Sequence, residues 1–212
     1  MKYILTDIEG TTTSISFVHE VLFPYSKKML EQFVFDHLDS EAVKKCVNEA
    51  GSTAILLKWI EEDKKEPALK TLQGLIWDEG YKSGALKGHI YDDVPAALEK
   101  WTNTGMKVGI YSSGSVQAQK LIFGYSIYGD LNKYFSHYFD TGVGHKRDAQ
   151  SYQNIVNELK INPEDILFLS DIVEELDAAK KIGMQTLQLV RSDIPTSVNH
   201  KTVKNFSEII FQ

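Results

Sequence analysis

The amino-acid sequence predicts an α/β protein with a mostly parallel sheet and an all-helical subdomain inserted after the first strand. Two observations lead to this fold class. Short apolar segments, bounded by polar residues or glycine, alternate with helix-like stretches over much of the chain. The long stretch between the first two of these segments carries helical patterns alone. A length of 212 residues suits one core domain with an insertion better than two independent domains.

Four apolar segments are predicted to be buried strands of the sheet. They span residues 3–6, 108–111, 166–169 and 186–190, and a weaker fifth strand is expected around residues 137–139. Helices are expected at residues 116–123 and 149–159.

The insertion is predicted to contain four helices. The first covers residues 18–35, where Pro24 either opens a new helix or kinks one. The second covers residues 40–50, and Ser52 or Thr53 caps the third, which runs to Ile60. Pro67 begins the fourth, which carries apolar residues at helical spacing up to Trp77. Glycines then mark the return to the core, at positions 80, 84 and 88. Helices inserted at this point are expected to form a cap over an active site.

The composition is that of an ordinary globular protein, with 42% hydrophobic and 25% charged residues. A net charge of −6 argues against a nucleic-acid or anionic-membrane partner, because both attract basic surfaces. The single cysteine, Cys46, excludes an internal disulfide and a cysteine-built zinc site, and we expect it to be a buried helix residue. The apolar run at the N-terminus is too short for a signal peptide or a membrane span, so an intracellular protein is expected.

Polar residues follow the predicted strands at the points where those strands end. Asp7 and Glu9 follow the strand of residues 3–6, and Ser112 and Ser113 follow that of residues 108–111. Asp171 follows the strand of residues 166–169. In a parallel α/β sheet, ligands bind beyond the carboxyl ends of the strands. These side chains, with the loop residue Lys146, are therefore expected to converge at one edge.

The segment from Asp7 to Thr12 is the strongest single signal. A strand-end aspartate can act as a nucleophile and form an aspartyl-phosphate, and Glu9 can carry the leaving-group proton. Gly10 allows a sharp turn that exposes backbone amides to a phosphate. The alternative is that Asp7 only caps the turn that follows it.

The other segments supply phosphate-binding and cation-binding groups. Hydroxyls and amides at Ser112 and Ser113 can hold phosphate oxygens, although one serine before residue 116 is also expected to cap a helix. Lys146 can neutralise both the phosphate and Asp7. Asp171 with Asp7 makes an oxygen-only site suited to Mg²⁺. Glu175 can orient Lys146 or a metal-bound water, whereas Glu174 and Asp177 are expected on a solvated helix face.

These segments, in this order, resemble the haloacid-dehalogenase-like hydrolase superfamily over nearly the whole chain. The resemblance implies a Rossmann-like catalytic core at residues 1–14 and 90–212 and a helical cap at residues 15–89. It also implies Asp7 as nucleophile and Ser112, Lys146 and Asp171 in the later motifs. One departure is Glu9, because most phosphatases of the superfamily carry a second aspartate there.

Through Glu9 and several longer strings, the chain is similar to the enolase-phosphatase family of methionine salvage, also called acireductone synthases. The strings are Asp7-Ile8-Glu9-Gly10-Thr11, Ile15-Ser16-Phe17-Val18, Leu22-Phe23-Pro24-Tyr25, residues 110–116, residues 119–124, and residues 139–141 leading to Gly144-His145-Lys146. The resemblance implies conversion of 2,3-diketo-5-methylthiopentyl-1-phosphate to the acireductone plus phosphate, through an aspartyl-phosphate. It implies one Mg²⁺ per chain and a cytoplasmic monomer, with a nuclear presence as well if the source is a eukaryote.

Residue by residue, the resemblance assigns catalysis to Asp7, Glu9 and Lys146, and substrate contacts to Ser112, Ser113 and Lys146. The metal ligands would be Asp7, Asp171 and Glu9, the last through its backbone carbonyl. Apolar cap residues such as Phe17 and Phe23 are candidates for holding the methylthio end, but their helical spacing favours a core role.

Three other functions compete with this one. A general phosphatase for phosphoglycolate or sugar phosphates is disfavoured by Glu9 and the string from Phe17 to Tyr25. A non-catalytic binding module would be expected to have lost Asp7 or Asp171. A haloacid dehalogenase would not require the metal site that Glu9 and Asp171 supply.

Overall fold

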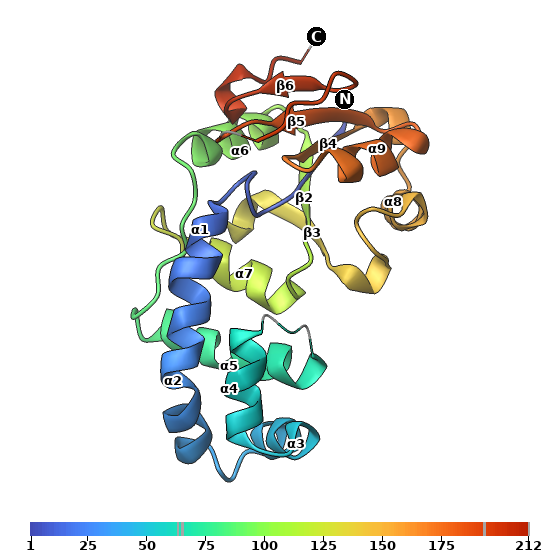
Figure 1. Cartoon of the computed structure of the whole chain (residues 1–212). Helices are drawn as coiled ribbons and strands as arrows, with labels where there is room; N and C mark the ends of the chain where they lie inside the picture. The colour runs from blue at the N-terminus through green and yellow to red at the C-terminus, as the bar shows by residue number, and fades with distance from the viewer. Residues whose placement is uncertain (63, 65, 193, 212) are drawn as a thin grey trace. The chain divides into compact units, whose positions relative to one another are not determined.

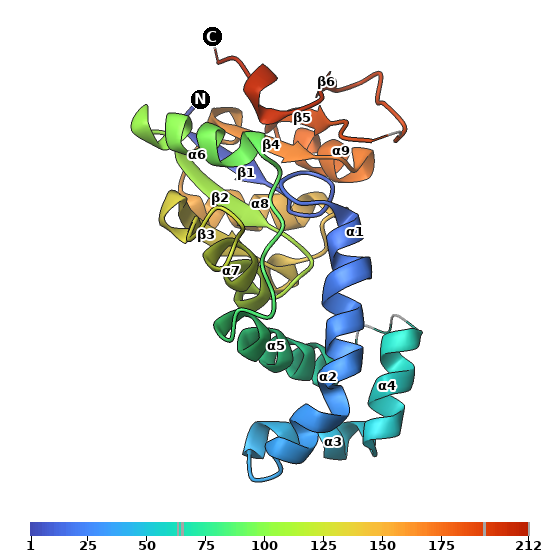
Figure 2. The same ribbon diagram turned by 90° about the vertical axis from the view of Figure 1, so that its left-hand side faces the viewer.

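A computed structural model describes the whole chain except residues 63, 65, 193 and 212 (Figures 1 and 2). The chain divides into two compact units. One comprises residues 1–15 and 88–212 and contains the sheet, and the other comprises residues 16–87 and is helical. No helix in the described part of the chain is long and apolar enough to cross a membrane.

The sheet-bearing unit is an alternating α/β structure. Its strands are β1 (Tyr3–Thr6), β2 (Lys107–Tyr111), β3 (Phe135–Phe139), β4 (Ile166–Ser170), β5 (Gln185–Leu189) and β6 (Lys201–Val203). Its helices are α6 (Asp93–Asn103), α7 (Val116–Gly124), α8 (Ala149–Leu159) and α9 (Val173–Lys181), with short 3₁₀ turns η2 (Asn132–Tyr134), η3 (Thr141–Val143), η4 (Pro163–Asp165) and η5 (Phe206–Glu208).

All six described strands run parallel, in the order β3-β2-β1-β4-β5-β6. The predicted fold class, including the weak fifth strand around residues 137–139, is confirmed. Sequence reasoning missed β6 and α6. Strand β6 is only three residues long and begins with two exposed polar residues, so it carries no apolar signal. Because β1 lies between β2 and β4, the residues that directly follow these three parallel strands meet at the carboxyl edge of the sheet.

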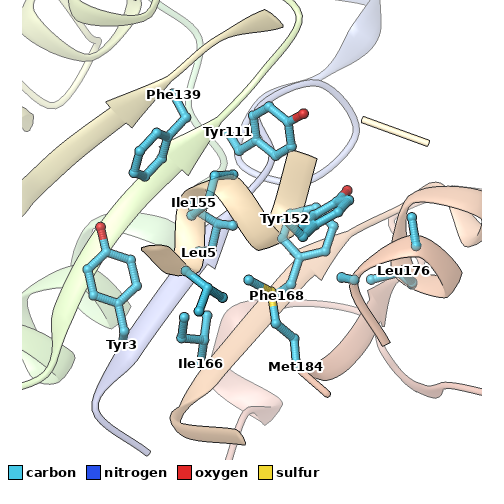
Figure 3. Packing of buried hydrophobic residues seen from close by; sticks show 13 residues of the cluster. Tyr3, Leu5, Tyr111, Phe139, Tyr152, Ile155, Ile166, Phe168, Leu176 and Met184 are labelled. Atoms are coloured by element: carbon cyan, nitrogen blue, oxygen red, sulfur yellow. The ribbon is translucent and has the colours of Figure 1, made fainter. Parts of the chain in front are cut away.

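One face of the sheet is covered by α8 and α9. Tyr3 and Leu5 of β1 pack there against Ile155 of α8 and Leu176 of α9 in a continuous buried cluster (Figure 3). Alternate residues of a strand point to opposite faces, so Ile4, also fully buried, faces the other side. A sheet buried on both faces explains why its central strands read as unbroken apolar runs.

The helical unit is built from α2 (Phe23–Asp36), α3 (Glu41–Ala50), α4 (Thr53–Glu61) and α5 (Pro67–Lys82). It is entered through α1 (Ile15–Phe17) and a π-helical turn, η1 (Val18–Leu22). Pro24 is the second residue of α2, which follows directly on the π-helical turn η1. Ser52 caps α4 by accepting the Ile55 amide. Cys46 is buried on α3, as expected.

Gly80 does not mark the return to the core, as the sequence suggested, but lies inside α5. A Cβ at this position would come within 2.7 Å of the Tyr25 ring and 2.9 Å of Leu86. Gly80 is therefore required by close packing within the helical unit. The chain leaves the helix only after Lys82, and Gly84 supplies the positive φ of the turn.

Two phenylalanines of α2 provide a matched test of the helical core. Phe33 is 6% exposed and Phe35 is 68% exposed. Phe33→Ala is expected to lower the free energy of unfolding by about 3–5 kcal/mol, because it removes a large side chain and leaves a cavity. Phe35→Ala should change it by about 0.5 kcal/mol or less. Urea unfolding followed by circular dichroism measures both, and equal effects would contradict the packing described here.

Candidate active site

The central strand delivers Asp7 to the carboxyl edge of the sheet. Thr6 is level with Ile110 of β2 and with Leu169 of β4, and the Asp7 amide donates to the Leu169 carbonyl at 2.9 Å. Asp7 is therefore level with the last residues of both neighbouring strands. Ser112 and Asp171 come directly after those strands. The register places all three residues at one edge.

Lys146 lies between two buried carboxylates. Its Nζ is 2.5 Å from Asp7 Oδ1 and 2.8 Å from Glu175 Oε2. All three side chains are about nine-tenths buried, and Glu175 also accepts a hydrogen bond from Ser170 Oγ at 2.9 Å. Burial opposes the charge on Lys146, but the two carboxylates outweigh it and raise the lysine pKa. The lysine is therefore held as a cation against Asp7.

The loop that carries Lys146 is fixed by its backbone, through residues that sequence reasoning missed. Tyr152 Oη donates to the Lys146 carbonyl at 2.8 Å, and Tyr111 Oη donates to the Gly144 carbonyl at 3.0 Å. The two rings pack edge to face, with centroids 5.4 Å apart (Figure 3). Ser151 Oγ donates to the His145 carbonyl at 2.8 Å. Lys146 lies in this loop, three residues before α8, as the sequence predicted for a loop residue.

Gly10 lets Asp171 approach the loop that follows Asp7. Gly10 has a φ of +73°, and a Cβ there would overlap the Asp171 carboxylate. Glycine is thus required both for the backbone conformation and for space. The Asp171 carbonyl accepts a hydrogen bond from Gln188 Nε2 at 3.0 Å, and this bond fixes the backbone of Asp171.

The site holds more negative than positive charge. Burial, the Asp7 charge and the nearby Glu9 raise the pKa of Asp171 to about 7. Burial and Asp7 also raise the pKa of Glu175, despite its pairing with Lys146. Asp171 Oδ1 is buried and has no hydrogen-bond partner in the described structure. A buried oxygen with this surplus of charge suits a hard divalent cation.

The residues at this edge therefore fit Mg²⁺, with one restriction. Among the described residues, no three His, Cys, Asp or Glu side chains gather closely enough to hold an ion by themselves. A cation beside Asp7 and Asp171 would need a backbone carbonyl or water to complete its ligands. The Glu9 carbonyl, one residue before Gly10, is the candidate that the resemblance to the enolase-phosphatase family implies.

The two candidate phosphate-binding serines differ in burial. Ser112 is 3% exposed and accepts the Gly114 amide on its Oγ at 3.2 Å, whereas Ser113 is exposed. Ser115 is the residue that caps α7, accepting the Ala118 amide. Gln119, another residue that sequence reasoning missed, donates to the Gly114 and Phe139 carbonyls at 2.8 and 2.9 Å and fixes this turn.

Of the neighbouring acids, Glu174 is exposed on α9, as expected. Asp177 was expected on the same solvated face, and its side chain is 46% exposed. Its Oδ1 lies 3.0 Å from Nε2 of the buried His200. It belongs to the contact between α9 and the segment leading into β6, away from the loop residues described above.

A parallel α/β core that gathers buried carboxylates and a lysine beyond its central strands defines a class of hydrolases. Residues 1–183 match the haloacid dehalogenase-like hydrolase family, and the chain belongs to that family. Phosphatases of this family generally use Mg²⁺.

Relatives over nearly the full length narrow the family to the enolase-phosphatases. Enolase-phosphatase E1 of Enterobacter sp. (strain 638) is 49% identical over 99% of this chain and 96% of its own length. That of Drosophila willistoni is 48% identical over 98% and 96%. The crystal structure of the UTR4 protein of Saccharomyces cerevisiae is 36% identical, covers 98% of this chain and 99% of its own, and has a TM-score of 0.84. The predicted family and enzyme class are confirmed.

The charge surplus gives a testable dependence of stability on pH. Because the pKa of Asp171 rises from 3.8 to about 7 on folding, the folded state resists ionisation, and stability is lost as pH rises through this window. Asp171→Asn is expected to raise the melting temperature of the cation-free protein by several degrees at about pH 8 and little at about pH 4. Thermal unfolding in chelator measures this.

In the same experiment, Mg²⁺ should raise the melting temperature of the wild type at pH 8 and leave Asp171→Asn nearly unchanged. Lys2→Met, which removes the exposed pair with Asp165, is the control and should keep the Mg²⁺ response. A full Mg²⁺ response in Asp171→Asn would exclude Asp171 as a ligand.

Proposed function

We propose that the protein converts 2,3-diketo-5-methylthiopentyl-1-phosphate to the acireductone and phosphate, with Asp7, Glu9 and Lys146 performing the chemistry. The observation that carries the proposal is the buried lysine paired with Asp7, next to an acid, Asp171, that has a free buried oxygen. Lys146 thereby holds one carboxylate in place for attack, and a second carboxylate is left for a cation. The enolase-phosphatase relatives support the choice of substrate.

In the phosphatase step, Asp7 attacks phosphorus and the bond from phosphorus to the ester oxygen breaks. The leaving oxygen takes a proton from Glu9, which is half-buried two residues after Asp7. Water then attacks the aspartyl-phosphate, Glu9 takes the proton of that water, and Asp7 is regenerated. Lys146 offsets the charge on Asp7 and on the phosphate, while Ser112 and Ser113 donate to phosphate oxygens.

In the enolisation step, the proton leaves carbon 1, which carries the phosphate and is adjacent to a ketone. Glu9 is the residue we assign to remove it and becomes protonated, while the ketone oxygen takes a proton from water to give the enol. Glutamate reaches further than the aspartate found in most phosphatases of the superfamily. A single residue can thus serve both half-reactions.

The cation would be one Mg²⁺ held by Asp7, Asp171 and the Glu9 carbonyl. When bound, it neutralises negative charge on the phosphate and on the enolate oxygen. Without it, a phosphate would have to approach four buried or half-buried carboxylates, those of Asp7, Glu9, Asp171 and Glu175, with Lys146 as its main compensating charge.

We also propose the domain roles expected from the sequence, a catalytic core at residues 1–14 and 90–212 and a cap at residues 15–89. A monomer acting in the cytoplasm on this small phosphorylated substrate completes the proposal. These assignments rest on the resemblance to enolase-phosphatases.

A turnover assay on the diketone phosphate tests the function directly. With Mg²⁺, enol absorbance and free phosphate should both appear, and excess chelator should stop both.

Asp7→Asn should reduce phosphate release at least about 10³-fold, because it removes the nucleophile, while the circular dichroism spectrum stays unchanged. Phosphate release from simple esters alone would leave a general phosphatase and refute the substrate assignment. Undiminished turnover by Asp7→Asn would refute the nucleophile.

A further inference from the structure

Arg191 follows β5 and lies outside the segment that matches the hydrolase family. Its side chain is 7% exposed. Nη1 and Nη2 each donate to one oxygen of Asp93 at 2.8 Å, and Nε donates to the Thr11 carbonyl at 2.6 Å. The guanidinium carbon also lies 4.1 Å from the centre of the Tyr91 ring. All of these contacts are with groups of the protein itself.

Asp93, the acid of this pair, is itself fixed. It is the first residue of α6, and its Oδ2 accepts the Phe206 amide at 2.6 Å. Burial opposes its ionisation, yet the hydrogen bonds from Arg191 and Phe206 hold its pKa below the usual range. A bidentate arginine–carboxylate pair with both partners largely buried keeps one geometry. The pair therefore presents Nε at a fixed point.

The group that Nε holds belongs to the proposed catalytic loop. Thr11 is the residue after Gly10, which backs onto Asp171, and is two residues after Glu9. The Ile8 carbonyl accepts the amides of residues 11, 12 and 13, so the turn is closed from inside. Its Thr11 carbonyl is held from outside by Arg191.

We propose that Arg191, clamped by Asp93, is a positioning residue for the reaction. It holds the turn from Asp7 to Thr13 so that Glu9 and Gly10 keep their places beside Asp7 and Asp171. This inference rests on the proposed function of those residues. Arg191 acts through the backbone and takes no part in bond breaking.

A second, independent tie supports the same role for the end of β5. Gln188 of this strand donates to the Asp171 carbonyl at 3.0 Å and to the Pro195 carbonyl at 2.9 Å. Two residues of one segment therefore hold the backbones of the two acidic loops. The segment beyond the matched family region therefore contributes to the site through hydrogen bonds to backbone carbonyls.

Lysine cannot replace this arginine, because it lacks the planar fork that grips Asp93 and Thr11 together. Arg191→Lys is expected to lower kcat about 10–100-fold on the diketone phosphate, with KM changed less than about threefold, because small misplacements of reacting groups are costly. Asp93→Asn keeps the shape of the acid and should lower kcat about tenfold. The kcat of the double variant should lie within about twofold of that of Arg191→Lys, since the two residues act as one unit. Lys2→Met, which removes an exposed ion pair at the other end of β1, is the control for a substitution in the same unit away from the site.

Rates are measured well below the melting temperature of each variant, together with the Mg²⁺-induced rise in melting temperature, which needs no substrate. Loss of kcat at nearly constant KM, with a weaker Mg²⁺ response than in Lys2→Met, is the expected result. Reduced stability with wild-type kcat would make Arg191 a purely structural residue and overturn the proposal. If Arg191→Lys does not fold, kcat of Asp93→Asn decides the matter by the same criterion. If the wild type fails on the diketone phosphate but cleaves p-nitrophenyl phosphate, the substrate is wrong, and the comparison is made on that ester.

Discussion

The site depends on one constraint, which is that several acidic groups are buried together with a single lysine. Lys146 satisfies one oxygen each of Asp7 and Glu175, and Ser170 contributes a further hydrogen bond. Asp171 is compensated only in part: burial and the Asp7 charge raise its pKa to about 7, and its Oδ1 has no hydrogen-bond partner in the described structure. Removing charge from water costs several kcal/mol per ion unless it is paired, so the unliganded site is held at a cost to stability. That cost is offset when a divalent cation binds and compensates the surplus negative charge.

Much of the surrounding structure serves to keep this cluster in place. The parallel sheet brings the ends of β1, β2 and β4 together, and side chains then hold each following loop by its backbone. Tyr111 and Tyr152 fix the lysine loop, Gln119 fixes the serine turn, and Gln188 and Arg191 fix the two acidic loops. Hydrogen bonds to main-chain carbonyls place a loop while leaving its functional side chains free.

The sequence was sufficient to predict the fold class and the positions that meet at the sheet edge. Asp7, Ser112 and Asp171 could be found because each directly follows an apolar run that reads as a buried strand. Lys146 and Glu175 could be named but not placed, since a loop lysine has no periodic signal. Their salt bridge depends on the tertiary approach of α9 to the loop before α8.

The supporting residues could not be predicted, for a physical reason. Tyr152 reads as an ordinary apolar helix position, and only the structure shows its hydroxyl on the Lys146 carbonyl. Arg191 has only a weak signal in the sequence. It is one of the two arginines of the chain, and it is the first residue after a predicted strand. Its partners Asp93 and Thr11 are 98 and 180 residues away, so no local pattern connects them. Strand β6 was missed because it pairs at an edge with exposed polar residues.

The central claim is that Asp7 is the reacting carboxylate and that Asp171 completes a cation site beside it. A crystal structure with Mg²⁺ and trifluoroberyllate, which mimics a phosphoryl group on a carboxylate, tests both parts at once. The account predicts beryllium bonded to an Asp7 oxygen and one Mg²⁺ on Asp7, Asp171 and the Glu9 carbonyl. Beryllium on another residue, or Mg²⁺ bound without Asp171, would contradict it.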